Sequence, residues 1–266
     1  MTVHEGSRFY FYVNDGSGNF TEQAVARGAD LTVTELEHKG YSVGIVDYNL
    51  DGYLDIYVSE WGVGRSSEQA LHSALLKNVG SSNPGHFVVA TEEAGIVQPV
   101  KSNEQSGFSS AWADFDGDGW PDLALIADYG KSQMYWNDGD GSFTNTTAAS
   151  GVGFDENGMG VAVADYNGDG LLDFYVTSIF DEFSNKKNGS HTGNKLYRNN
   201  GGRNFQEVSV AVGPNGGVSR AGWGWGASFL EFDNDGDFDL VTTNGHNQSE
   251  GGNRDTTPYV DAATDP

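Results

Sequence analysis

Short runs in which apolar and polar residues alternate recur along most of this chain. "SVGIVDY" ends at Tyr48 and "LDIYVSE" begins at Leu54, while "VAVADY" ends at Tyr166 and "LDFYVTS" begins at Leu172. β-Branched and aromatic residues at a period of two, interrupted by Asn, Asp and Gly, are typical of strands joined by a tight turn. Each pair of runs therefore predicts a β-hairpin with a polar turn.

A second kind of hairpin is expected between these. "FYVNDGSGNFTE" and "MYWNDGDGSFTN" each place Asn and Gly between two strand-like runs, and Asn and Gly supply the positive φ that hairpin turns need. The turn asparagines are Asn14, Asn78, Asn137 and Asn199, and the following strands open with Phe20, Phe87, Phe143 and Phe205. Two hairpins in each roughly 60 residues predict four-stranded antiparallel sheets, the content of a propeller blade.

The turns of the first hairpins share an acidic template. "DYNLDGYLD" starts at Asp47, "DFDGDGWPD" at Asp114, "DYNGDGLLD" at Asp165 and "EFDNDGDFD" at Glu231. All four read acid, x, Asp or Asn, x, Asp, Gly, x, x, Asp, and the starts lie 67, 51 and 66 residues apart. A fixed template at such intervals indicates a repeat architecture.

Composition narrows the classes of function. The chain has 266 residues, 38 acids, 14 bases and a formal charge of −24, so no basic surface is available for nucleic acid. Its 33 aromatic residues are enough for a packed core. No cysteine is present, so disulfides are excluded, and no run of 18 apolar residues predicts a membrane span. The N-terminal residues do not have the pattern of a signal peptide.

The acidic template resembles the calcium loop of FG-GAP (VCBS) repeats, which occur in integrin α-subunit propellers and in secreted bacterial proteins. "GWGWGASFLEFDNDGDFDLVTTNGH", together with "YRNNGGRNFQEV", is similar to the cartilage-acidic-protein-like branch of that family. The resemblance runs from about Phe9 to His246. It implies an all-β fold: a β-propeller of four-stranded antiparallel blades with calcium-binding loops between strands 1 and 2.

About four blades are expected in this chain. The repeats are expected at about 1–40 (partial), 41–107, 108–157, 158–221 and 222–246 (partial), followed by a polar tail at 247–266. Residues 1–266 are thus either one propeller domain or a propeller fragment. Since the family usually has about seven blades, we expect part of a larger propeller, with a closed four-bladed ring as the alternative.

The chemistry of the acidic loops predicts a hard dication, because every side-chain ligand they offer is oxygen. An EF-hand is excluded, since its twelfth position needs Glu and here holds Val58, Leu125, Val176 or Thr242. Strands rather than helices are also expected on both sides. The alternative is that these are solvated acidic turns, but four loops in phase favour structural calcium at about four sites.

The resemblance implies side-chain ligands at positions one, three, five and nine of each loop and a backbone carbonyl at position seven. The first two sets are Asp47, Asn49, Asp51, Asp55 with Tyr53, and Asp114, Asp116, Asp118, Asp122 with Trp120. The other two are Asp165, Asn167, Asp169, Asp173 with Leu171, and Glu231, Asp233, Asp235, Asp239 with Asp237. Glu231 departs from the pattern, so the fourth site is expected to be the weakest.

Long connections are expected on the face of the propeller opposite these turns, where function usually lies. Candidate ligand-binding residues in them are Trp61, Arg65, His72, Lys101, His191, Arg220 and Trp223. Each also has a structural explanation: Trp223 and Trp225 fit packing at the inner edge of a blade, and the histidines fit ordinary loop positions. No catalytic motif for a zinc protease, a serine hydrolase or a nucleotide phosphate site occurs.

The expected function is therefore a non-enzymatic, calcium-binding module of an extracellular or cell-surface protein, serving adhesion or the binding of a protein or glycan ligand. The alternative is a calcium-stabilised polysaccharide lyase or hydrolase with its site on the long-loop face.

Overall fold

In a computed structural model, residues 5–6, 8–31, 38–61, 73–97, 106–180, 192–213 and 217–245 are described. They form three large antiparallel sheets, in which neighbouring strands are consecutive in sequence apart from β1. The first sheet holds β1 (Glu5–Gly6), β4 (His38–Val46), β5 (Asp55–Glu60), β6 (Ala74–Asn78) and β7 (Phe87–Val89). The second holds β8 (Gly107–Ala113), β9 (Asp122–Ala127), β10 (Gln133–Asn137) and β11 (Phe143–Asn145). The third holds β12 (Val161–Ala164), β13 (Asp173–Val176), β14 (Lys195–Asn199) and β15 (Phe205–Glu207).

Two further hairpins, one near each end of the described sequence, form separate two-stranded sheets. The N-terminal hairpin pairs β2 (Tyr12–Asn14) with β3 (Phe20–Glu22), and the C-terminal hairpin pairs β16 (Gly224–Leu230) with β17 (Asp239–Asn244). The described helices are one four-residue turn, α1 (Ala24–Arg27), and two 3₁₀ turns, η1 (Gly80–Ser82) and η2 (Gly217–Ser219). The predicted all-β class and the four-stranded antiparallel sheets are confirmed.

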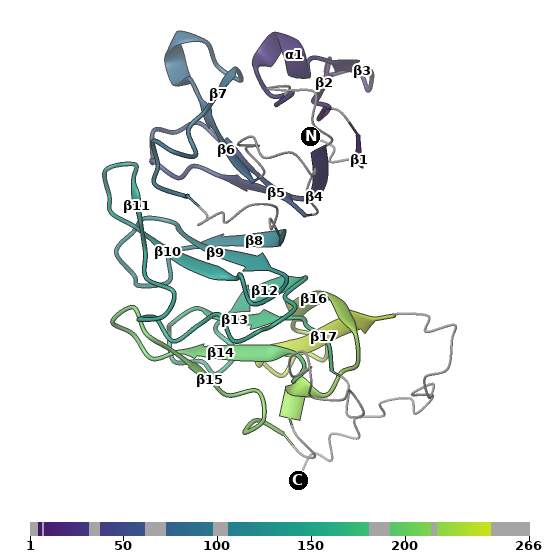
Figure 1. The fold of residues 1–266 in the computed structure, drawn as a ribbon, viewed down its shortest axis with the longest axis vertical. Coiled ribbons are helices and arrows are strands. Elements are labelled where there is room, and N and C mark those ends of the chain that lie inside the picture. Colours follow the sequence, from purple (N-terminus) through teal and green to yellow (C-terminus); the bar gives the residue numbers. More distant parts are fainter. Residues whose placement is uncertain are drawn as a thin grey trace.

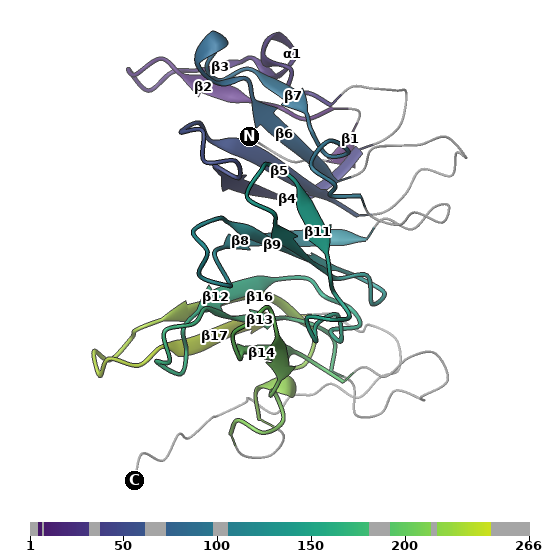
Figure 2. The same ribbon diagram turned by 90° about the vertical axis from the view of Figure 1, so that its left-hand side faces the viewer.

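The sheets are stacked face to face in an open arc (Figure 1). The N-terminal hairpin lies at the top of the long axis, and the C-terminal hairpin lies beside the third sheet in the lower half (Figures 1 and 2). The first strands of successive sheets lie next to one another: β4 contacts β8, β8 contacts β12 and β12 contacts β16. These strands therefore form the inner edge of the arc.

Apolar side chains fill the space between successive sheets. Tyr57 and Leu75 of the first sheet share a cluster with Leu123 and Tyr135 of the second. A second cluster joins the second sheet to the third, and a third cluster packs Phe9, Ala29 and Leu31 against the first sheet. The central strands β5, β9 and β13 are buried along their whole length because both of their faces are covered. One face of β5 packs against the second sheet and the other against Phe9, Ala29 and Leu31.

The hairpin topology separates two faces of the arc. The acidic turns follow β4, β8, β12 and β16, so all four lie at the same ends of the sheets. In Figure 2 the turns β4–β5, β8–β9 and β16–β17 all point to the left. Residues at the start of the first strands, or beyond the end of the second strands, therefore lie on the opposite face.

Candidate functional site

The acid at position one of each loop holds the turn together through backbone amides. Asp114 Oδ1 accepts from the amide of Asp118 at 3.0 Å, and its Oδ2 accepts from Gly119 at 2.9 Å. Asp47 and Asp165 make the same pair of bonds in their own loops. The glycines at position six have φ angles in the left-handed region, which favours glycine: 87° for Gly52, 92° for Gly119, 87° for Gly170 and 97° for Gly236.

Glu231 adopts the same role despite its extra methylene. Its Oε1 accepts from Asn234 and Asp235 at 2.7 and 3.2 Å, and its Oε2 accepts from Gly236 at 2.7 Å. The longer side chain thus folds back onto the amides that Asp contacts in the other loops. The fourth loop closes in the same way, so its departure in sequence does not change its shape.

The aspartate at position nine is buried beneath each of the first three loops. Asp55, Asp122 and Asp173 are 0% exposed. Asp122 Oδ2 accepts from the amide of Phe115 at 3.0 Å, and its Oδ1 accepts from the amide of Asn137 at 2.9 Å. Asp55 is held likewise by Tyr48 and Asn78. Asn199 donates to Asp173 at 2.7 Å.

Burial raises the pKa of Asp55 and Asp173 to about 6 and that of Asp122 to about 7. Neighbouring loop carboxylates add to the effect, through Asp116 and Asp118 in the case of Asp122. Buried carboxylates that repel one another are stabilised by a nearby cation. The side chains of these loops offer only oxygen ligands, and a buried aspartate lies beneath each of the first three loops. Such a set of ligands fits a hard dication.

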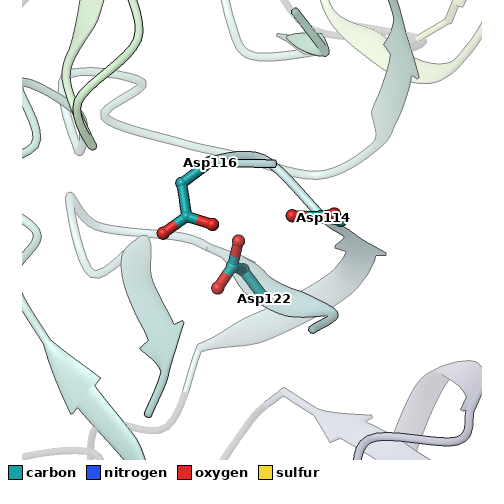
Figure 3. A group of neighbouring side chains, drawn as sticks. All are labelled: Asp114, Asp116 and Asp122. Carbon is teal, nitrogen blue, oxygen red and sulfur yellow. The ribbon is translucent and has the colours of Figure 1, made fainter. Parts of the chain in front are cut away.

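Carboxylate oxygens converge in two of the loops. Asp114, Asp116 and Asp122 each offer one oxygen, and these atoms lie within 4.8 Å of one another (Figure 3). Glu231, Asp233 and Asp239 form a group of the same kind. In the first and third loops, position three is an asparagine, Asn49 or Asn167. Its Oδ1 accepts a hydrogen bond from the backbone amide of the aspartate at position five, and its Nδ2 donates to the carboxylate of that same aspartate.

The remaining predicted ligand positions, five and seven, are linked to each other. The amides of Tyr53, Trp120, Leu171 and Asp237 each donate to the carboxylate of the aspartate at position five, at 2.9 Å. In the second loop Arg203 is an additional neighbour, since its Nε donates to Asp116 at 2.6 Å. This arginine comes from the β14–β15 turn of the third sheet, so one protein cation already lies against the second loop.

The turn asparagines have a role that sequence reasoning missed. Asn137 Nδ2 donates to the carbonyl of Tyr48 in the first sheet at 2.9 Å, and Asn199 Nδ2 donates to Phe115 in the second at 2.7 Å. Each asparagine thus joins the acidic loop of its own sheet to the loop of the preceding sheet. The only sequence signal was the recurrence of Asn at matched positions, which we interpreted as turn geometry.

The candidate residues of the long-loop face are described only in part. Arg65, His72, Lys101 and His191 lie outside the described residues. Trp61 Nε1 donates to Asp128 in the second sheet at 3.2 Å. Arg220 is exposed, with its guanidinium 5.4 Å from the ring of Phe180, and Trp223 pairs with Ile179 in an isolated bridge.

A row of four aromatic rings crosses the inner edge of the arc on this face, and we call it the aromatic row: Tyr41, Trp61, Phe108 and Trp225. The Phe108 ring is central, with centroids 4.8 Å from Tyr41, 5.7 Å from Trp61 and 6.3 Å from Trp225. Tyr41 and Trp225 are 46% and 42% exposed. The sequence indicated Trp61 as a candidate and favoured packing at the inner edge of a blade for Trp225. The recurring Gly40-Tyr41, Gly107-Phe108 and Gly224-Trp225 pairs were the signal for Tyr41 and Phe108.

Comparison with known proteins agrees with this architecture. Residues 102–176, which contain the second sheet and the second and third acidic loops, match the FG-GAP-like repeat family. Human cartilage acidic protein 1 is 22% identical over 258 residues, a match that covers 79% of this chain and 38% of that protein. The predicted resemblance to FG-GAP repeats and to this branch is confirmed.

A solved structure gives the fold independently. It is a lectin of Agrocybe aegerita, described as showing specific recognition of non-reducing terminal N-acetylglucosamine. The two chains superpose with a TM-score of 0.54 at 18% identity, over 89% of this chain and 55% of the lectin chain. This chain therefore spans about half of the lectin and well under half of the human relative. Residues 102–176 therefore match FG-GAP-like repeats, and the chain shares the fold of the lectin over most of its own length.

Proposed function

We propose that this chain is a calcium-stabilised ligand-binding module of an extracellular or cell-surface protein, with the aromatic row as its contact surface for a glycan. The observation that carries the proposal is that four rings from three different sheets meet on one face while remaining partly open to solvent. Monomeric proteins rarely leave such a group of large apolar side chains exposed without a binding role.

Structural calcium is the second part of the proposal. Asp47, Asp114, Asp165 and Glu231 each begin a loop of one shape, and the aspartates at position nine supply a buried carboxylate beneath three of them. With calcium bound, these residues would provide the oxygen ligands and the ion would neutralise their mutual repulsion. Millimolar calcium, as found outside cells, would keep even weak sites filled.

The acidic turns and the aromatic row lie on opposite faces of the arc, and this arrangement supports a binding role. The acidic turns fix the ends of the strands on one face, and the aromatic row lies at the far ends of the same strands, Tyr41 near the start of β4 and Phe108 near the start of β8. A rigid scaffold that presents open aromatic rings suits a sugar ring, whose C–H face packs on aromatic surface while its hydroxyls reach polar groups. Asp128, which accepts from Trp61, is one such polar group beside the row.

The lectin likeness is consistent with a glycan, although it establishes the fold alone. In the part of the chain that the structure describes, no helix is long and apolar enough to cross a membrane. No observation on the described residues specifically favours the alternative, a polysaccharide lyase or hydrolase. The glycan-binding experiment below distinguishes it from a binding module.

Binding should depend on the ring of Tyr41. We expect Tyr41→Ala to weaken binding of a glycan selected on an array by about tenfold, the effect of losing one aromatic contact. Tyr41→Phe keeps the ring and should stay within about twofold of the wild type. Titration calorimetry with the selected glycan measures both.

Val88→Ala is a second control, because Val88 is an exposed residue of the outer strand β7, away from the row. Equal binding by wild type and Tyr41→Ala would rule out the row as the contact surface. New reducing or unsaturated ends in the glycan after incubation would show turnover and would favour the lyase or hydrolase instead.

A further inference from the structure

The second acidic loop, residues 114–122, has a basic side chain against it that comes from a different sheet. Arg203 lies in the turn between β14 and β15 of the third sheet, and its Nε donates to Asp116 Oδ2 at 2.6 Å. Its Nη2 lies 3.5 Å from Asp118 Oδ2. Among the described residues, no other acidic loop has a basic side chain within ion-pair distance. The contact therefore singles out the second loop.

The predicted ligand side chains of the second loop carry one more negative charge than those of the first and third loops. Position three is Asn49 in the first loop and Asn167 in the third, so positions one, three, five and nine supply three aspartates in each. In the second loop position three is Asp116, and all four positions are aspartates. Four aspartates and one arginine give a net charge of −3, the same as in the other two loops. Arg203 therefore compensates the additional carboxylate.

Arg203 also stands where the asparagine amide donates in those loops. Asn167 Nδ2 donates to the carboxylate of Asp169 at 2.9 Å, and the first loop has the same bond. Asp116 has no amide to donate, and the guanidinium of Arg203 approaches the matching carboxylate oxygen of Asp118 instead. One side chain from the neighbouring sheet thus supplies both the charge and the donor.

The backbone at Arg203 has a conformation that arginine does not favour. Its φ is 63°, and the residues at the matching place in two other turns, four after the turn asparagine, are Gly18 and Gly141 with φ of 90° and 91°. A residue with a Cβ is disfavoured in this left-handed region and persists there where surrounding contacts hold it. Arg203 has such contacts, because its guanidinium also lies 5.3 Å from the centre of the Trp136 ring. An arginine at a glycine position therefore indicates a role for its side chain.

We propose that, with calcium bound in the acidic loops as proposed above, Arg203 lowers the affinity of the second loop for the ion to that of a loop with asparagine at position three. The number of charged ligands is one of the features by which calcium sites set their affinity. The ion and the guanidinium are attracted to the same carboxylates, and they repel each other. The side chain of Asp116 is 9% exposed and that of Arg203 is 42% exposed, so solvent screens this repulsion only in part.

NMR titration with calcium tests the proposal because it resolves the loops one by one. The glycine at position six of each loop donates its amide to the acid at position one, so its resonance reports on that loop: Gly52, Gly119, Gly170 and Gly236. Solutions in which a chelator sets the free calcium concentration give a Kd for each resonance. Gly119 reads the second loop, and Gly52 in the first sheet serves as the control within the same sample.

Removal of the charge should strengthen calcium binding at the second loop alone. We expect Arg203→Gln to lower the calcium Kd read from Gly119 by about fivefold, the effect of removing one partly solvated charge beside a dication, and to leave the Gly52 titration unchanged. Arg203→Lys keeps the positive charge, so its Gly119 titration should stay closer to that of the unsubstituted chain than to that of Arg203→Gln. The dispersion of the other amide resonances shows that each variant is folded.

The direction of the change distinguishes this role from a purely structural one. If Arg203 only held the loop in shape, Arg203→Gln would weaken calcium binding at Gly119, and that result would overturn the proposal. An unchanged Gly119 titration would overturn it too, with calcium binding itself intact. If calcium shifted none of the four glycine resonances in the unsubstituted chain, the calcium sites themselves would be refuted, and Arg203 would only join the second and third sheets.

Discussion

Replacing Asp122 by alanine is expected to lower the free energy of unfolding by about 2 kcal/mol or more, even with calcium removed by a chelator. The carboxylate accepts from the buried amides of Phe115 and Asn137, so its loss leaves two buried donors without a partner. Each such donor costs about 1–3 kcal/mol. The variant is also relieved of a buried acid whose pKa is raised by burial, which offsets part of the loss.

Asp118→Ala is the matched control in the same loop. Asp118 accepts from the exposed amide of Trp120, which water can satisfy once the carboxylate is gone. We therefore expect a change within about 0.5 kcal/mol in chelator. Urea unfolding of both variants gives the comparison. Equal costs would mean that Asp122 has no special structural role.

Chelation of calcium is expected to lower the stability of the whole chain by more than the replacement of Asp122 does. An ion that binds only the folded state contributes about 2.7 kcal/mol per site at 100 times its Kd. One site at that level would raise the Tm by about 5–10 °C in a domain of this size, and several filled sites would add to it. Thermal melting with and without a calcium chelator measures the difference.

Adding magnesium to the chelated chain shows whether the Tm depends on calcium itself or only on neutralisation of the acidic loops by any dication. It requires tight octahedral geometry, so it should restore little of the Tm lost on chelation. Full recovery in magnesium would mean that the loops need only diffuse positive charge. A Tm that chelation leaves unchanged would mean that hydrogen bonds such as those from Gly52 and Gly119 hold the loops without metal.

The strands and turns were predictable because their signals are local. Alternation along β5 and β13, and the acidic template after β4 and β12, depend on residues within one hairpin. The closing of each loop on its first acid also follows from nearby residues, since Asp114 and Gly119 are five positions apart. Local turn chemistry is therefore enough to predict the sheets and the shape of the candidate metal sites.

Contacts between sheets were not predictable in the same way. The bond from Asn137 to Tyr48 joins residues 89 positions apart, and Trp61 reaches Asp128 across 67 positions. Tyr41 and Phe108 meet only because β4 and β8 are neighbours along the inner edge. Such contacts depend on how one sheet is rotated against the next, which the alternation of a single strand does not specify.

Titration of the chelated chain with calcium in a calorimeter measures whether the acidic loops bind calcium. We expect saturable binding at several sites per chain, and Asp114→Ala should remove one of them while the others remain. Absence of calcium heat, with tight binding of zinc in its place, would show that the loops are not calcium sites.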